Sequence, residues 1–441
     1  MLLKKCKSMS KKHTILSFFF FFAGIGLYAQ DTIKIMQYNL LNYGNTTGYC
    51  SESNNNTRDK DEGIRTILEY ASPDIIVVNE FSKIQQLQTD FLNKNLNIKG
   101  VRYWKSDNII NHAQSSIINH IFYNSDKIIL KKHNYIAAKY RDVDVYELYF
   151  KTTTLSMGDT TKLIYVSAHL KAGSSDTDVS DRNVTAQKIM NYLADNHTND
   201  NVIISGDLNL YGSNEPAYQK FTQSAAYGGA LFIDPISDEI SDGSWSNGNM
   251  APYHTQSTHS ESNGCAAAGG LDDRFDLILI SDEIRYGNKG LRYVTDSYET
   301  VGNDGYHYNR SVNSGYNYAV SSEVADALYT VSDHLPITIE MTLSNPLGIV
   351  DAPQNTSFCL FATPNPANDH VTFHFNSTQP QIITFDVMTT TGTLVTTSQT
   401  YCDQGYCTYR INLSSLTDGF YIVKITGENG QTAFCKFVKQ H

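Results

Sequence analysis

The chain lacks a long hydrophobic run beyond its first thirty residues. The one such run, Ile15–Leu27, holds thirteen residues, follows five lysines and is succeeded by small-residue chemistry at YAQ (28–30). A membrane-spanning helix needs about 20 apolar residues, whereas a secretory signal has this shorter core and basic start. We therefore expect residues 1–29 to be a signal peptide and the mature chain to be secreted, without a transmembrane segment.

The sequence also lacks an excess of positive charge. It has 34 lysines and arginines against 45 aspartates and glutamates, and its formal charge of −11 becomes −16 when the signal peptide and its five lysines are removed. Proteins that bind nucleic acid through a generally basic surface have the opposite balance, so that class is excluded. An acidic protein can still act on a phosphodiester if a divalent metal supplies the local positive charge.

Cysteine and histidine clusters with zinc-site spacing are missing too. The segment HTQSTHSESNGC (254–265) matches no standard zinc pattern, and we expect a polar loop there. Six cysteines remain after the signal peptide, and an even number in a secreted protein favours disulfides. Cys265 is a candidate partner for Cys50, whereas four of the six follow residue 358.

The strong periodic segments indicate two domains. Residues 31–343 mix apolar strand-like runs such as DIIVVNEF and NVIISGD with amphipathic helical runs such as GIRTILEY, which predicts a mixed α/β or α+β domain around a buried sheet. Periodicity alone does not separate one doubly wound sheet from two packed sheets. Residues 344–358 carry two prolines and predict a linker, and short alternating strands in 359–441 predict a small β-sandwich.

Polar side chains recur where the apolar strands of the first domain end. A single one is usually a cap or a turn residue, but six strong strands share the feature, which is typical of a functional rim. The residues are Asn39, Glu80, His169, Asp207 with Asn209, Asp276, and Asp333 with His334.

The residue types at these strand ends suit phosphoryl chemistry. Asn39, Glu80 and Asp333 offer hard oxygen donors of the kind that Mg²⁺ prefers. His169 and His334 offer imidazoles that can donate to a phosphoryl oxygen or transfer protons near neutral pH. An anionic phosphate ester is the substrate that such a metal-plus-imidazole site would handle.

The successive motifs resemble those of the endonuclease/exonuclease/phosphatase superfamily, which includes deoxyribonucleases, abasic-site endonucleases, neutral sphingomyelinases and inositol-polyphosphate phosphatases. The resemblance covers about residues 31–345 and implies an α+β fold, a four-layer αββα sandwich of two packed sheets flanked by helices. The motifs are MQYNLLNY, DIIVVNEF, VSAHLKAG, SGDLNLY, DDRFDLIL and VSDHLPI.

The resemblance implies that Asn39 and Glu80 bind the metal and that Asp333 helps to hold it. The metal is expected to be Mg²⁺, with Mn²⁺ or Ca²⁺ as alternatives. Family members often have Gln before the metal-binding Glu, where this chain has Asn79.

The remaining motif residues have implied roles in catalysis. Asp207 would orient or deprotonate the attacking water, and Asn209 would bind the scissile phosphate. His169 would donate to the phosphate or leaving group, and His334 would contact phosphate while Asp276 orients it, since an orienting carboxylate fixes an imidazole's tautomer.

Two further assignments rest on position alone. Arg182 follows His169 at roughly the distance where several family members carry an arginine, and we expect it to contact substrate. The group that orients His169 has no clear motif, and Tyr123 and Glu147 are candidates.

A second resemblance concerns residues 360–441. PNPANDHVTF, VMTTTGTLV and LSSLTDGFYIVKI resemble the type A sorting domain of the type IX secretion system. This implies export by that machinery, followed by release or surface attachment.

Together these features predict a secreted, monomeric, Mg²⁺-dependent phosphodiesterase, most simply a nuclease with nucleic acid as substrate. A phosphatase or a sphingomyelinase-like lipid phosphodiesterase would use the same core with other rim loops. A non-catalytic surface-binding protein is a more distant alternative, because all eight motif residues are present. DNA versus RNA, and endo- versus exonucleolytic cleavage, stay open.

Overall fold

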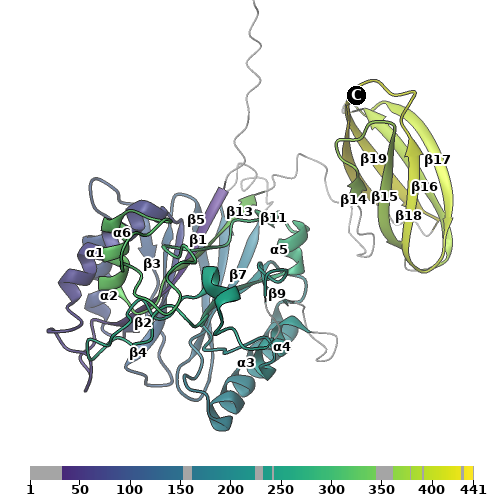
Figure 1. Ribbon diagram of the computed structural model, residues 1–441. Helices are drawn as coiled ribbons and strands as arrows, with labels where there is room; N and C mark the ends of the chain where they lie inside the picture. The colour runs from purple at the N-terminus through teal and green to yellow at the C-terminus, as the bar shows by residue number, and fades with distance from the viewer. Residues whose placement is uncertain are drawn as a thin grey trace, which may run out of the picture. The chain divides into compact units, whose positions relative to one another are not determined.

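The computed structural model describes residues 32–151, 161–223, 232–240, 243–343, 361–377, 379–389, 392–428 and 432–440. The chain divides into two compact units, residues 1–346 and 347–441 (Figure 1). The expected signal peptide and linker lie outside the described residues. Among the described helices, none combines the length and the apolar character that crossing a membrane requires.

Two sheets form the centre of the first unit. In sheet order, the first contains β11 (Leu291–Tyr293), β13 (Ile337–Leu343), β1 (Thr32–Tyr43), β2 (Ile75–Ser82), β4 (Ile117–Asn124) and β3 (Trp104–Ser106), with β12 (Glu299–Thr300) beside β13. The second contains β5 (Ile128–Ile136), β6 (Val143–Phe150), β7 (Lys162–Ser167), β8 (Val202–Asp207), β10 (Asp276–Ser281) and β9 (Phe232–Ile233).

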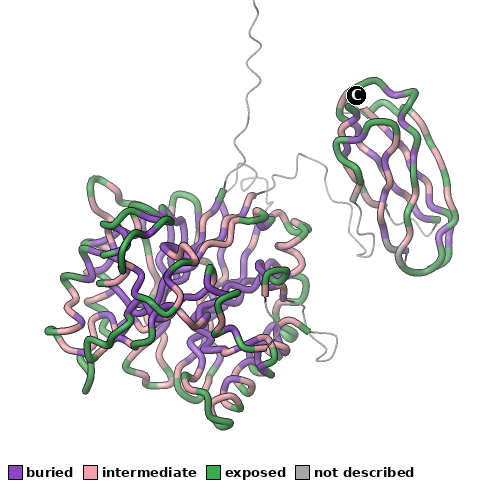
Figure 2. The backbone as a smooth tube through the Cα atoms, viewed as in Figure 1, coloured by how far each residue is buried: buried purple, intermediate pink, exposed green. Residues whose placement is uncertain are grey.

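The two sheets pack face to face. One apolar cluster joins residues of the first sheet, such as Ile35 and Val77, to residues of the second, such as Tyr165, Ile203 and Ile278. These strands read as continuous apolar runs because both of their faces are covered. Figure 2 shows the buried backbone concentrated in these central strands.

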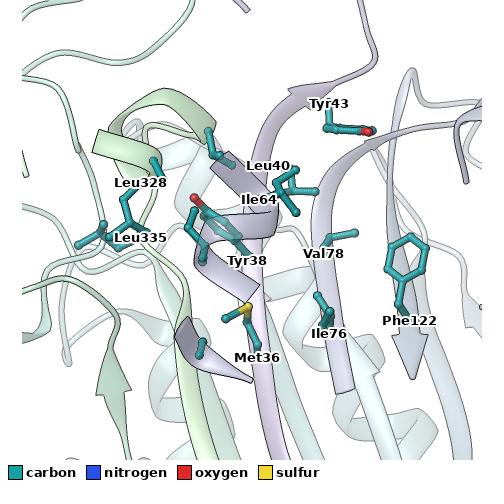
Figure 3. Packing of buried hydrophobic residues seen from close by; sticks show 14 of the residues in the cluster. Met36, Tyr38, Leu40, Tyr43, Ile64, Ile76, Val78, Phe122, Leu328 and Leu335 are labelled. Carbon is teal, nitrogen blue, oxygen red and sulfur yellow. The ribbon is translucent and has the colours of Figure 1, made fainter. Parts of the chain in front are cut away.

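Helices cover the outer faces. On the first sheet, α1 (Thr57–Ala71) and α6 (Ser322–Val331) bury Ile64 and Leu328 against Met36, Tyr38 and Val78 (Figure 3). On the second sheet, α3 (Asp176–Asn196) and α4 (Pro216–Thr222) pack through a separate cluster. The shorter helices are α2 (Gln85–Phe91), the π-helix Leu92–Leu96, the 3-10 helix Gly248–Tyr253 and α5 (Asp282–Tyr286). The αββα layering expected from the sequence is confirmed.

Strand directions determine where the polar strand ends meet. β1 and β2 are parallel, as are β7 and β8, whereas β10 and β13 run antiparallel to their neighbours. The last residues of β1, β2, β7 and β8 therefore lie at the same rim as the first residues of β10 and β13. Asn39 lies beside Asn79, and Asp207 beside Asp276, in this register.

The second unit is a β-sandwich around its own apolar cluster. One sheet contains β14 (Phe361–Thr363), β15 (His370–Ser377) and β18 (Gly405–Asn412); the other contains β17 (Leu394–Cys402), β16 (Gln381–Thr389), β19 (Gly419–Gly427) and β20 (Thr432–Lys439). Cys402 bonds to Cys407, and Cys435 has no disulfide partner among the described residues.

Candidate functional site

A backbone irregularity at the rim directs Glu80 into the site. The β1–β2 register shifts between Asn39 and Tyr43, and Glu80 has a φ of 57°. Bulges of this kind aim side chains at functional rims, and positive φ in a non-glycine residue persists only where surrounding contacts hold it. The backbone N–H of Asn42 provides such a contact, donating to Glu80 Oε2 at 2.9 Å.

A buried lysine holds the end of β1 in place. Lys60 Nζ, from α1, donates to the carbonyl oxygens of Leu40 and Leu41 at 2.7 and 2.6 Å. Burial lowers the pKa of Lys60 to about 7, although the charges of Asp333 and Glu80 counteract this. Lys60 therefore satisfies two carbonyls at the turn where the ladder is interrupted.

Glu80, His169 and Asp207 form a compact group of potential ligands. One ligand atom from each lies within 4.8 Å of the other two, and His169 Nε2 is 3.4 Å from Asp207 Oδ2. Asn39 Nδ2 donates to Glu80 Oε1 at 3.3 Å and to Asp207 Oδ2 at 3.0 Å. The amide nitrogen of Asn39 thus faces the two carboxylates, and its oxygen accepts from the N–H of Leu41. Ligation by Asn39 requires this amide to turn.

The donor chemistry here fits a divalent cation. Two carboxylates and an imidazole meet in a buried setting, where like charges repel unless a cation or a proton compensates. Asp333 adds a buried oxygen, Oδ1, with no hydrogen-bond partner among the described residues, while its Oδ2 accepts from the N–H of Ala267 at 2.8 Å. Hard oxygens of this kind suit Mg²⁺, Mn²⁺ or Ca²⁺.

His334 lies against Asp276, the carboxylate that the motif resemblance assigns to orient it. Its Nδ1 donates to Asp276 Oδ2 at 2.6 Å, and Gln37 Nε2 donates to the other oxygen of Asp276 at 3.1 Å. Burial alone would lower the pKa of His334, but the charges of Asp276, Asp207 and Asp333 outweigh it, so the pKa lies well above its ordinary value. The His334 Nε2 atom lies 3.8 Å from Asp207 Oδ2.

Asp207 and His169 have opposite electrostatic tendencies. Burial raises the pKa of Asp207, as do the charges of Asp276 and Glu80, while His334 and Asn39 counteract them. Burial lowers the pKa of His169 well below its ordinary value, and the charges of Arg141 and His334 lower it further. His169 is therefore a neutral imidazole, and a cation in this group would return Asp207 to its charged form.

The GDLN segment owes its form to a close approach of two strands. A Cβ at Gly206 would lie 1.7 Å from the carbonyl oxygen of Ala168, and Gly206 has a φ of 142°. Only glycine fits there. Asn209, at a φ of 51°, donates its backbone N–H to Asp207 Oδ1 and its Nδ2 to the carbonyl of Leu170.

Asn79, the departure from the family pattern, has a positioning contact. Its Oδ1 accepts from the N–H of Asp207 at 2.8 Å and from Gln37 Nε2 at 2.9 Å, and its Nδ2 donates to Asn119 at 2.8 Å. Asn119 in turn donates to Asp144 Oδ2 at 3.1 Å. This buried polar chain crosses from the first sheet to the second and fixes the backbone of Asp207.

The segment 254–265 is a loop, as expected, with residues 260–264 exposed, but its first half is largely buried. Five of the six residues 254–259 are buried, from His254, Thr255 and Thr258 at 0% exposure to His259 at 3%, and Gln256 is half-buried. Thr255 Oγ1 accepts from the N–H of Asp276, and Gln256 Nε2 lies 2.7 Å from His334 Nε2. The sequence does not indicate that Gln256 lies at the site, because a short polar run without periodicity carries no signal of burial.

A disulfide also secures this rim. Cys50 and Cys265, 215 residues apart, are bonded, as the sequence had suggested. Asn54 and Asn263 exchange hydrogen bonds beside the disulfide, linking the loop after β1 to the segment that contacts Asp333 through Ala267.

Arg182 does not lie with the other predicted residues. Its guanidinium is fully buried and donates twice to Glu215, at 3.0 and 2.8 Å, and to the carbonyls of Lys171 and Gly173. This geometry disagrees with the expected substrate contact and indicates a structural role.

A different arginine, Arg141, lies beside His169. Its Nε and Nη2 donate to the carbonyls of His169 and Leu170 at 3.0 and 2.6 Å. Its charge interacts with those of Glu80 and Asp207. No sequence pattern points to Arg141, because an arginine just before a strand is usually a solvated surface residue.

Neither candidate for orienting His169 contacts it. Tyr123 pairs with Ile75, at the opposite end of β2 from Glu80, and Glu147 accepts from the hydroxyl of Tyr149. Among the described residues, His169 Nδ1 has no hydrogen-bond partner.

The fold and the rim define a two-sheet sandwich with acids, amides and imidazoles gathered at one end.

Residues 362–440 match the sequence model of the family described as "Secretion system C-terminal sorting domain". The predicted sorting domain is therefore confirmed, and it directs the chain through type IX secretion to the cell surface or the extracellular space. No curated protein matches the chain.

The chain is similar to solved structures of endonuclease/exonuclease/phosphatase proteins. One is D. rerio TDP2 complexed with a single-strand DNA product, at 15% identity and a TM-score of 0.44, covering 71% of this chain and 100% of that one. The human Nocturnin catalytic domain has 13% identity and a TM-score of 0.44, covering 71% and 98%. An endonuclease/exonuclease/phosphatase from Beutenbergia cavernae has 11% identity and a TM-score of 0.42, covering 92% and 99%.

Proposed function

We propose that this protein is a secreted, metal-dependent phosphodiesterase that hydrolyses nucleic acid. One observation carries the proposal: Glu80, His169 and Asp207 converge within 4.8 Å, beside a His334–Asp276 pair separated by 2.6 Å. A cluster of acidic donors with two imidazoles is the composition that phosphoester hydrolysis requires.

In this proposal Glu80 holds a divalent cation, together with Asn39 and Asp333. When bound, the cation neutralises phosphate charge and increases the acidity of water. The phosphate ester binds between this centre and the imidazoles.

The chain's own residues orient the reactants and move protons. Asp207 accepts the proton of the attacking water, because its buried carboxylate lies 3.4 Å from His169 Nε2 and 3.8 Å from His334 Nε2 and faces the same space as both imidazoles. His334, kept protonated by Asp276, donates from Nε2 to a phosphoryl oxygen that gains charge in the transition state. This requires the Gln256 amide, whose nitrogen lies 2.7 Å from His334 Nε2, to turn its oxygen toward the imidazole. His169 and Asn209 contribute neutral donors, and Arg141 adds a fixed positive charge behind His169.

Substrate and metal are tested together on the mature chain. Supercoiled plasmid, single-stranded RNA, bis-p-nitrophenyl phosphate, p-nitrophenyl phosphate and sphingomyelin are offered with Mg²⁺, Mn²⁺, Ca²⁺ or EDTA. Asp207→Asn, which keeps the side-chain shape, is compared with Asp59→Asn, an exposed aspartate in the first turn of α1.

The proposal expects metal-dependent cleavage of a nucleic acid by the wild type and by Asp59→Asn, and its loss in Asp207→Asn. Turnover of only the monoester or only sphingomyelin would keep the site and replace the substrate. A folded protein that hydrolyses none of these esters would refute the enzymatic proposal.

A further inference from the structure

A cleft of about 890 Å³ lies beside the candidate site and contains none of its predicted residues. Its walls come from the loop after β1, the first turns of α1, and the α2–π-helix segment. The residues that define it for the argument below are Gly44, Glu52, Arg58, Asp61, Arg65 and Lys94. The volume falls in the usual range of ligand sites, about 300–1,000 Å³.

The cleft adjoins the turn that carries the site. Gly44 lies two residues after Asn42, whose N–H holds Glu80, and a Cβ at Gly44 would be 3.5 Å from the Cβ of Ser82. Asp61 accepts from the hydroxyl of Tyr43 at 2.6 Å, so the opposite wall is bonded to the end of β1 as well. The cleft and the site therefore share the turn after β1.

Positive groups outnumber negative ones in the lining. Arg58 is exposed, and its guanidinium has no hydrogen-bond or ion-pair partner among the described residues, whereas its backbone N–H donates to Asn56 Oδ1. Arg65 donates to the Lys94 carbonyl and to Asn95 through Nη1 alone, and Lys94 is paired with Asp90 in a solvent-exposed contact. Such exposed pairs contribute little and exchange readily for another anion.

The two acids of the lining already have donors. Asp61 Oδ1 accepts from Tyr43 and from Asn95 Nδ2 at 2.7 Å, and Glu52 accepts from Asn56 Nδ2 at 2.9 Å. On a chain whose overall charge is negative, the lining carries three positive and two negative side chains, and the Arg58 guanidinium has no partner among the described residues.

We propose that the cleft binds the sugar-phosphate backbone of the nucleic-acid strand next to the diester being cleaved. The proposal rests on the function proposed above and specifies its substrate as a strand of several nucleotides. Arg58 and Arg65, seven residues apart on α1, are spaced by about 10.5 Å along the helix axis, which allows them to contact different phosphates of one strand. Arginine forms directional, charge-assisted bonds with phosphate oxygens.

Binding is measured apart from turnover. A fluorescently labelled eight-nucleotide single-stranded DNA and the matching RNA are titrated with Mg²⁺ into mature Asp207→Asn protein by anisotropy. The titrations are repeated with Arg58→Ala, Arg65→Lys and Arg292→Ala added. Arg292 is the matched control, because it is exposed on β11 and pairs with Thr342 at the end of β13 away from Asp333. Hydrolysis of bis-p-nitrophenyl phosphate is measured with the same substitutions in the active background.

The proposal expects Arg58→Ala to weaken oligonucleotide binding about five- to tenfold and to reduce the salt slope by about 0.7, the share of one phosphate contact on a single strand. Arg65→Lys, which keeps the charge and protects the fold, should weaken binding less, and Arg292→Ala should change nothing. Hydrolysis of the small diester should be the same in all three.

Equal binding by Arg58→Ala and Arg292→Ala would overturn the cleft proposal, and so would the absence of oligonucleotide binding by a protein that hydrolyses the small diester. In both cases the phosphodiesterase itself would stand. Failure to hydrolyse any diester, with oligonucleotide binding lost in Arg58→Ala, would instead refute the proposed reaction and leave the cleft.

Discussion

Replacing Asp276 by Asn tests whether His334 acts as a charged donor. The carboxylate lies 2.6 Å from His334 Nδ1 and also accepts from Gln37 Nε2. In the variant, the amide oxygen takes the Gln37 contact, so the amide nitrogen faces His334 and forces Nδ1 to become an acceptor. The imidazole is then neutral, and its bond to a phosphoryl oxygen loses charge assistance.

The size of the effect follows from the strength of that bond. A hydrogen bond to a charged group contributes about 1.5–3 kcal/mol, which corresponds to a decrease in kcat of roughly 10- to 100-fold. The fold should be kept, because Asn fills the same space and removes a buried charge whose desolvation is costly.

The assay is metal-dependent hydrolysis of bis-p-nitrophenyl phosphate, with thermal unfolding measured on the same samples. The expected result is a large loss of kcat with an unchanged or higher Tm. A kcat within twofold of the wild type would refute a charged donor role for His334, and a loss that accompanies unfolding would assign Asp276 to stability instead.

Three further predictions concern stability. Gly206→Ala places a Cβ 1.7 Å from the carbonyl oxygen of Ala168 and should lower the free energy of unfolding in urea by at least about 4 kcal/mol. The control Gly48→Ala, whose Cβ would have no atom within 4 Å, should be neutral. Equal stabilities of the two variants would contradict the close approach at Gly206. Burial lowers the pKa of His133, but its bonds to Asp107 and Asp144 outweigh burial and raise this pKa to about 9. The stability that protonated His133 contributes is therefore complete below pH 6.5 and is lost as the pH rises through 9. Because burial raises the pKa of Asp144, the His133–Asp144 pair contributes less than the shift of His133 implies. The Tm difference between wild type and His133→Gln should therefore shrink between pH 6.5 and 9, and a constant difference would exclude the charged pair. Cys50→Ser removes the disulfide that links residues 215 apart and should lower the free energy of unfolding by up to about 5 kcal/mol through loop entropy. A Tm that does not change on this substitution would contradict a stabilising role for the disulfide.

Much of the fold could be predicted because its core strands are buried on both faces. Runs such as Ile75–Val78 and Val202–Ile204 are continuous apolar segments that end in acids or amides, and this pattern survives in the sequence. The glycine before Asp207 is also a clear sequence feature with a structural reason, since no other residue fits against Ala168. The number of sheets followed from the motif resemblance and not from periodicity, because periodicity records burial and not the partner that causes it.

Candidate residues could be predicted where a polar side chain follows an apolar strand. Residues that reach the site only through long-range pairing could not be predicted. His334 and Asp276 follow from their motifs, but Gln256 lies against His334 only through long-range pairing, since its backbone bridges to both Asp273 and His334. Arg182 and Arg141 show the same limit. Glu215, 33 residues from Arg182 in the sequence, binds the Arg182 guanidinium. No local sequence pattern indicates that ion pair.

The most direct test of the account is hydrolysis of bis-p-nitrophenyl phosphate by the mature protein and its Glu80→Gln variant in Mg²⁺, each repeated in EDTA. Glu80 is the carboxylate that the β2 irregularity aims at Asp207 and His169. The account predicts turnover by the wild type that EDTA abolishes and that falls at least about 100-fold in Glu80→Gln, as expected when a ligand of a catalytic cation is removed. Turnover that persists in EDTA, or a Glu80→Gln variant as active as the wild type, would contradict it.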